Sequence, residues 1–189
     1  MKKKWMALCL AAVMATGMMG CQPQNNDQTA NQTPPTEQVS DLGWLVHNTD
    51  GTMTVTDSTG REVVLPEKLT QIAPSGTTAQ MILYTLVPDL MVGWGKTPSK
   101  VQQKYIPEKY YNLPEFGQFY GKNASLNMEA LIAAKPQVII DMGDMKKGHK
   151  EDMDRIQEQT GIPAIFIEAN LDNFAAAYRM LGELFGVQD

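Results

Sequence analysis

Four short segments of the chain hold the side chains best suited to binding a small molecule. They span residues 74–78, 93–97, 117–121 and 142–147, and we place each at the carboxyl end of a predicted strand. In an open α/β sheet, ligands bind just beyond the carboxyl ends of the strands. The four segments are therefore expected to converge on one binding site.

The side chains in these segments suit a planar or anionic ligand. Aromatic rings can stack on a macrocycle or a catecholate ring, and lysines can pair with carboxylates or with an anionic ferric chelate. Hydroxyl groups, together with the free N–H groups at the start of the following helix, can receive an anion. The alternatives are core packing for the rings and a solvated loop for the lysines. The predicted ligand-binding residues are Ser75, Thr77, Trp94, Lys96, Phe119, Tyr120 and Lys146, with Lys147 as a further cation.

Other kinds of chemistry find little support in the sequence. The chain has two histidines, His47 and His149, which we interpret as lone surface residues, so no metal site and no cofactor are predicted. Ser75 precedes Gly76, but it does not lie in a G-x-S-x-G nucleophile motif. The same turn lacks the lysine of a phosphate-binding P-loop. We therefore predict that the protein is not an enzyme, and a hydrolase is the least favoured alternative.

The N-terminus has the pattern of a lipoprotein signal peptide. A basic start, Met1–Lys4, precedes an uncharged and mostly apolar stretch up to residue 20 that is shorter than a comfortable membrane span. Residues 18–21, Met-Met-Gly-Cys, resemble a bacterial lipobox, in which Cys21 carries the lipid and begins the mature protein. The alternative is an ordinary signal peptide followed by a chance cysteine. The lipid would hold the protein on the outer face of the cell membrane.

The charge of the chain argues against nucleic acid as a partner. Its 16 Lys and Arg residues stand against 21 Asp and Glu residues, a net charge of −5. Loss of residues 1–20 removes three lysines and no acid, which leaves a charge of −8. A nucleic-acid-binding protein would instead present a basic face.

Residues 21–40 are predicted to form a flexible tether. They are dominated by Gln, Asn, Thr and Pro, and Val39 is their only large apolar residue. Such a segment cannot bury enough surface to offset the entropy lost on ordering. It would separate the lipid from the folded part of the chain.

The rest of the chain is predicted to be a β-hairpin lead-in (41–69) followed by an α/β domain (70–189). The hairpin combines strands at 52–57 and 61–65 with a turn at 58–60. Beyond residue 70, strands alternate with helices, which is typical of a parallel sheet with helices on both faces. Ser75 or Thr77 is expected to cap the first helix, and Asn127 the second. The strands are expected at 71–73, 90–94, 137–141 and 163–167, and the helices at 79–86, 128–134, 151–159 and 171–185.

Four stretches in this order and spacing resemble one family of proteins. They are the hairpin and first strand (54–75), Leu-Met-Val-Gly-Trp (90–94), the helix that runs through Lys-Pro into a buried strand (126–140), and Thr-Gly-Ile-Pro (160–163). Together they resemble the ABC-transporter substrate-binding proteins of the iron-siderophore, heme and cobalamin family. The resemblance covers about residues 52–186.

This resemblance carries expectations about fold, ligand and partners. It implies two α/β lobes joined by one long helix, with the ligand held between them and delivered to an ABC permease and its ATPase. A ferric siderophore is the first choice of ligand, and heme and cobalamin are the others. Glu129, the acid of the Asn-x-Glu-x-Leu stretch, is implied to dock onto arginines of the permease. Its alternative role is that of a helix acid stabilised by the helix dipole.

The length of the chain predicts that only the N-terminal lobe is present. Without the signal peptide and tether, 149 residues remain, which is enough for one lobe but not for two. The chain stops where the family would enter its inter-lobe helix, so we expect a fragment or a half-length product with a one-walled cleft and weak binding. The alternative function is that of a non-transport surface lipoprotein, a sensor or adhesion module that reuses one lobe.

Overall fold

The structure, a computed structural model, describes residues 37–188. The predicted signal peptide, the lipid acceptor Cys21 and the predicted tether up to residue 36 lie outside the described residues. The predictions about them therefore stay predictions.

Alternating side chains build an antiparallel sheet at the start of the described chain. In its two longest strands, Met53, Val55, Val63 and Leu65 are buried, while the residues between them are more exposed. This alternation confirms the predicted hairpin. The sheet is larger than predicted, however, because two short strands extend it on one side. Its strands, in order, are β1 (Gln38–Val39), β2 (Leu45–His47), β3 (Thr52–Thr56) and β4 (Glu62–Pro66).

The turn between β3 and β4 is organised by a buried carboxylate. Asp57 Oδ1 accepts hydrogen bonds from the backbone N–H groups of Thr59 and Arg61, at 2.9 and 3.0 Å. Asp57 Oδ2 accepts from the backbone N–H of Phe166, at 3.2 Å, and from the Arg61 guanidinium. Gly60 in this turn has a positive φ of 79°, which glycine adopts without strain because it has no Cβ. The turn is thereby fastened to the neighbouring parallel sheet.

Three parallel strands form the centre of the α/β part. They are β5 (Ile72–Pro74), β6 (Val138–Gly143) and β7 (Ala164–Glu168), in the order β5-β6-β7. Ile72 pairs with Val138, and Ile139 pairs with Ala164. The first five residues of β6 are buried, as expected for the middle strand of a sheet covered on both faces.

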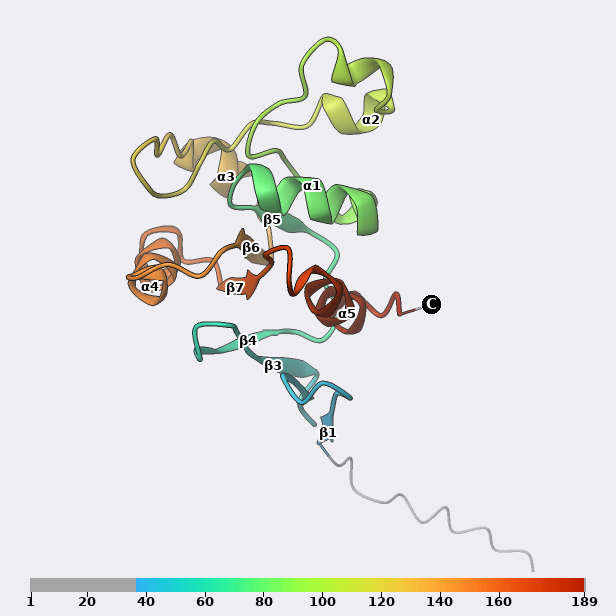
Figure 1. Cartoon of the computed structure of the whole chain (residues 1–189), viewed down its shortest axis with the longest axis vertical. Coiled ribbons are helices and arrows are strands. Elements are labelled where there is room, and N and C mark those ends of the chain that lie inside the picture. Colours follow the sequence, from blue (N-terminus) through green and yellow to red (C-terminus); the bar gives the residue numbers. More distant parts are fainter. Residues whose placement is uncertain (1–36, 189) are drawn as a thin grey trace, which may run out of the picture. The chain divides into compact units, whose positions relative to one another are not determined.

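The helices are arranged on both faces of this parallel sheet, as predicted (Figure 1). One cluster of buried side chains joins alternate strand residues, such as Ile140 and Ile165, to α1, α5 and the antiparallel sheet. A second cluster joins the other strand residues, such as Ile139 and Phe166, to α3 and α4. No helix within residues 37–188 has the length and apolar character of a membrane span. The helices are α1 (Thr77–Leu86), α2 (Glu108–Tyr111), α3 (Met128–Ala134), α4 (His149–Thr160) and α5 (Phe174–Phe185).

One predicted strand does not form. Residues 90–94 make isolated bridges instead, because Met91 pairs with Ile72 while Trp94 pairs with Glu115. The segment thus changes partner within four residues. Gly93 permits this path, since a Cβ there would lie 2.2 Å from the Phe116 ring.

The ends of several helices also differ from the prediction. Asn127 caps α3 as expected, with its Oδ1 accepting from the backbone N–H of Ala130 at 3.1 Å. Gly76, rather than Ser75 or Thr77, precedes α1, and no side chain caps that helix. Helix α4 begins two residues earlier than predicted, at His149, and α5 begins three residues later, at Phe174.

Candidate functional site

The carboxyl ends of β5 and β6 open into a recess of about 430 Å³, which we call the carboxyl-edge recess. The first turn of α1, the loop at 118–123 and the start of α4 complete its walls. The parallel register places Pro74 beside Ile140, so the residues that follow the two strands are neighbours. Ligands of open α/β sheets bind in this kind of position.

Four of the seven predicted ligand-binding residues line the carboxyl-edge recess. They are Ser75, Thr77, Tyr120 and Lys146, and Lys147 lines it as well. Their segments are far apart in the sequence. The two that follow β5 and β6 meet because these strands are parallel, and the loop that carries Tyr120 is held beside them by the Phe119 backbone N–H, which donates to the Ser75 carbonyl at 3.1 Å. Residues from three of the four predicted segments therefore line the same recess.

The other three predicted residues lie elsewhere. Trp94 is 3% exposed, and its indole N–H donates to the backbone carbonyl of Tyr110 at 2.8 Å. Phe119 is 6% exposed and packs in the core beneath α3 and α4. Lys96 is held by its backbone N–H, which donates to Gln80 Oε1 at 2.8 Å. None of the three lines the carboxyl-edge recess.

A buried carboxylate, Asp141, lines the recess. It is 4% exposed and lies within the buried part of β6. Its Oδ1 accepts a hydrogen bond from the Ser75 hydroxyl, and its Oδ2 accepts from the Tyr120 hydroxyl. His149 Nε2 lies 2.8 Å from the same Oδ2 and 2.7 Å from the Tyr120 oxygen. Four side chains from four segments thus share one hydrogen-bond network.

His149 is a core residue, which contradicts its interpretation as a surface histidine in a polar loop. It is 3% exposed, and its ring centroid lies 3.8 Å from that of Phe166. Its Nδ1 accepts the backbone N–H of Lys146 at 3.2 Å, so Nδ1 has no proton and the neutral ring is protonated on Nε2. The sequence feature that could have indicated a buried histidine was Asp141, because an acid within a buried strand requires hydrogen-bonding partners.

Tyr120 keeps its proton in this setting. Burial raises the pKa of the Tyr120 hydroxyl well above its ordinary value, and the negative charge of Asp141 raises it further. The phenol therefore donates to Asp141 throughout the normal pH range.

The rim of the recess is positively charged. Lys122, Lys146 and Lys147 are exposed and line it. None of them forms a salt bridge within the part of the chain that the structure describes. A neighbouring recess of about 330 Å³ shares Tyr120 and Lys146 and reaches the exposed Leu171.

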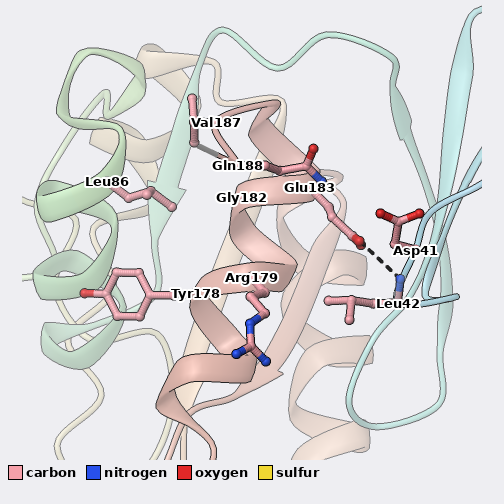
Figure 2. A pocket seen from close by; sticks show the side chains of 9 residues that line it. All are labelled: Asp41, Leu42, Leu86, Tyr178, Arg179, Gly182, Glu183, Val187 and Gln188. Carbon is pink, nitrogen blue, oxygen red and sulfur yellow. Dashed lines mark hydrogen bonds between the residues drawn. The ribbon is translucent and has the colours of Figure 1, made fainter.

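A separate recess, of about 470 Å³, lies between α5, the end of α1 and the loop at 41–42 (Figure 2). One of its two acids, Glu183, accepts from the Leu42 backbone N–H at 3.1 Å and from the Trp44 indole N–H at 2.7 Å. Its phenol, Tyr178, shares a hydrogen bond with Thr85 at 2.9 Å. These polar groups hold the fold together, so this recess is a weaker candidate for a ligand site.

Comparison with solved structures identifies the class of fold. No protein-family model and no curated protein matches the chain. An ABC transporter solute-binding protein from Sulfurospirillum deleyianum is similar in structure, with 26% identity and a TM-score of 0.59, over 71% of this chain and 42% of that one. The TroA-like binding protein FepB from Veillonella parvula has 20% identity and a TM-score of 0.52, over 71% and 43%. The molybdate-bound MolA from Haemophilus influenzae has 20% identity and a TM-score of 0.51, over 71% and 47%.

The structural neighbours are thus periplasmic solute-binding proteins of ABC transporters, as the resemblance predicted. This chain has their mixed α/β fold. It spans less than half the length of each of these neighbours.

Proposed function

We propose that this chain captures a small ligand outside the cytoplasm and delivers it to an ABC permease. The observation that carries the proposal is the carboxyl-edge recess, which brings Ser75, Thr77, Tyr120 and Lys146 together in the fold of a solute-binding protein. The structural neighbours are binding proteins, and we propose no catalytic role. In this proposal a lipid on Cys21 holds the chain on the outer face of the membrane.

The ligand in this proposal is a chelated metal compound. A ferric siderophore is the first choice, and heme or cobalamin are the others. Exposed lysines around a recess of about 430 Å³ suit the anionic groups at the edge of such a compound. A recess of this volume can hold part of such a ligand, and a second surface would be needed to cover the rest.

Isothermal titration calorimetry with a ferric siderophore, hemin and cobalamin tests this function. We expect one of the three to bind, and Lys146→Glu to weaken that binding about tenfold or more, because it reverses a charge at the rim. Lys104→Glu is the matched control, since Lys104 is also exposed and lies outside the recess. Absence of binding by all three ligands, or equal effects of the two substitutions, would contradict the proposal.

Glu129 is proposed to dock onto the permease. It is exposed in the first turn of α3 and does not line the carboxyl-edge recess. Glu129→Lys should therefore reduce uptake of the ligand by cells about tenfold or more, since like charges would face each other at the interface, while ligand affinity is unchanged. Glu108→Lys reverses an acid in the first turn of α2 and serves as the control. Normal uptake by the Glu129 variant would show that docking uses another surface.

A further inference from the structure

The segment just before α2 combines exposed apolar side chains with positive charge. It spans residues 98–107, and we call it the basic tip. Val101 is 67% exposed and Tyr105 is 83% exposed. Lys100 and Lys104, their neighbours in the sequence, are exposed as well. Figure 1 shows this part of the chain beyond α1, on the side away from the parallel sheet.

The tip is basic although the chain as a whole is acidic. The tip contains two lysines and no acid, whereas the chain carries a net charge of −5. Lys100 and Lys104 form no salt bridge within the described part of the chain. Beyond the tip, Lys109 pairs with Asp89 at 2.6 Å, and Glu108 adds one acid. The surplus of positive charge is therefore confined to the tip.

Packing and hydrogen bonds hold the tip in place. At its base the Trp94 indole N–H donates to the Tyr110 carbonyl at 2.8 Å. Tyr84 of α1 packs against both of these side chains, with ring centroids 5.4 and 5.6 Å away. Within the tip, Gln103 Nε2 donates to the Pro98 carbonyl at 2.9 Å. The exposed apolar side chains thus belong to a segment that is fastened to the body of the fold.

We infer that the basic tip contacts an anionic lipid surface. This inference goes beyond ligand capture and rests on the proposed function for the position of the chain at the outer face of the membrane. Tyrosine and lysine side chains both place an apolar body in a lipid interface and a polar end among the headgroups. Each lysine near an anionic surface strengthens binding about fivefold. Two lysines therefore give a weak contact, which becomes effective for a chain that is already held at the membrane.

The observations favour lipid over the other possible occupants. The lysines around the carboxyl-edge recess also face outward, but acids such as Asp144 and Asp152 lie among them. The tip has no such acid. In the proposed function Glu129 docks onto arginines of the permease, so the docking surface of the permease is basic and would repel the tip lysines.

Lysine labelling on vesicles tests the inference. The full chain is attached through an N-terminal histidine tag to nickel-chelating lipid, so the test does not depend on lipidation of Cys21. The vesicles consist of phosphatidylcholine alone or of phosphatidylcholine mixed with phosphatidylglycerol. An amine-acetylating reagent labels the exposed lysines, and mass spectrometry gives the rate at each one. We expect the anionic vesicles to slow labelling of Lys100 and Lys104 about fivefold or more, and that of the exposed Lys147 less than about twofold.

Two changes separate the apolar and the charged parts of the contact. Val101→Ser combined with Tyr105→Ser keeps both reporter lysines, yet it should lose about half or more of the protection, because buried apolar area adds to the electrostatic attraction. Leu171→Ser is the matched control, since Leu171 is 93% exposed and lies outside the tip. It should keep the full protection. About 1 M salt should abolish the protection of the unaltered chain, because it screens the charges.

Four results would overturn the inference. The first is equal labelling of the tip lysines on the two kinds of vesicle, and the second is undiminished protection in the double variant. The third is protection in solution that rises with protein concentration, which would identify a second copy of the chain as the occupant. The fourth is protection that requires the permease in the vesicles. Calorimetry measures ligand capture separately, so the proposed function would stand in each case.

Discussion

Replacement of Arg61 by methionine is expected to lower the free energy of unfolding by about 3 kcal/mol or more. The Arg61 side chain is 6% exposed and joins three parts of the chain. Its Nη1 donates to the backbone carbonyl of Ala164 at 2.6 Å and to Asp57 Oδ2 at 3.2 Å, and its Nε donates to Asp154 at 2.7 Å. Methionine fills much of the same volume but leaves the Asp57 carboxylate buried without its cation. The loss of that cation makes the effect large.

Urea unfolding followed by circular dichroism measures this loss. Arg155→Met is the matched control, because the Arg155 side chain is 56% exposed and its pair with Asp152 lies at the surface. Its loss should cost at most about 1 kcal/mol. Similar midpoints for the two variants would show that the Arg61 contacts contribute little to stability.

The second large effect is expected at His149. His149→Leu should lower the free energy of unfolding by about 3 kcal/mol, because it leaves the Lys146 N–H without its acceptor and deprives buried Asp141 of a partner. The leucine side chain keeps the site apolar toward Phe166, so the loss reports mainly on the hydrogen bonds. Ligand affinity should fall as well, since Lys146 lies at the rim of the recess.

The other histidine of the chain provides the control for this substitution. The His47 side chain is 38% exposed, and its Nδ1 lies 2.7 Å from Glu67, which is also exposed. His47→Leu should change the free energy of unfolding by no more than about 1 kcal/mol. Equal losses at the two positions, measured by the same urea titration, would contradict a structural role for the buried network.

Much of the fold follows from local patterns in the sequence. The alternation at 52–57 and 61–65 predicted β3 and β4, and the β-branched residues of 137–141 predicted the buried strand β6. Strands β1 and β2 were not predicted, since they are two and three residues long and are stabilised by pairing with β3 and with each other. The predicted strand at 90–94 has a suitable composition but no single neighbour to pair with. In both cases the available pairing partners in the folded chain, rather than local composition, determined whether a strand formed.

The site was predictable to the extent that it depends on topology. Parallel strands bring their carboxyl ends to one edge, and this placed Ser75 and Thr77 beside Lys146. Tyr120 follows no strand of the sheet, and the loop that carries it is held at this edge by the Phe119 backbone N–H, which donates to the Ser75 carbonyl at 3.1 Å. Residue type alone did not reveal that the rings of Trp94 and Phe119 point into the core. Residue type also did not reveal that His149 lies against Asp141. The loop at 144–148 brings the two together, and its sequence has no pattern that predicts its path.

The two bonds of Glu183 have a mechanical consequence for a chain pulled from its N-terminus. Tension would reach the folded part at β1, which pairs with β2 through two residue pairs and can be unzipped with little work. It would then meet Leu42 and Trp44, both of which are bonded to Glu183 on α5. Those two bonds would have to give way before the force reached β3 and β4. Because neither β1 nor α5 lines the carboxyl-edge recess, loss of this edge of the antiparallel sheet should leave the recess unchanged.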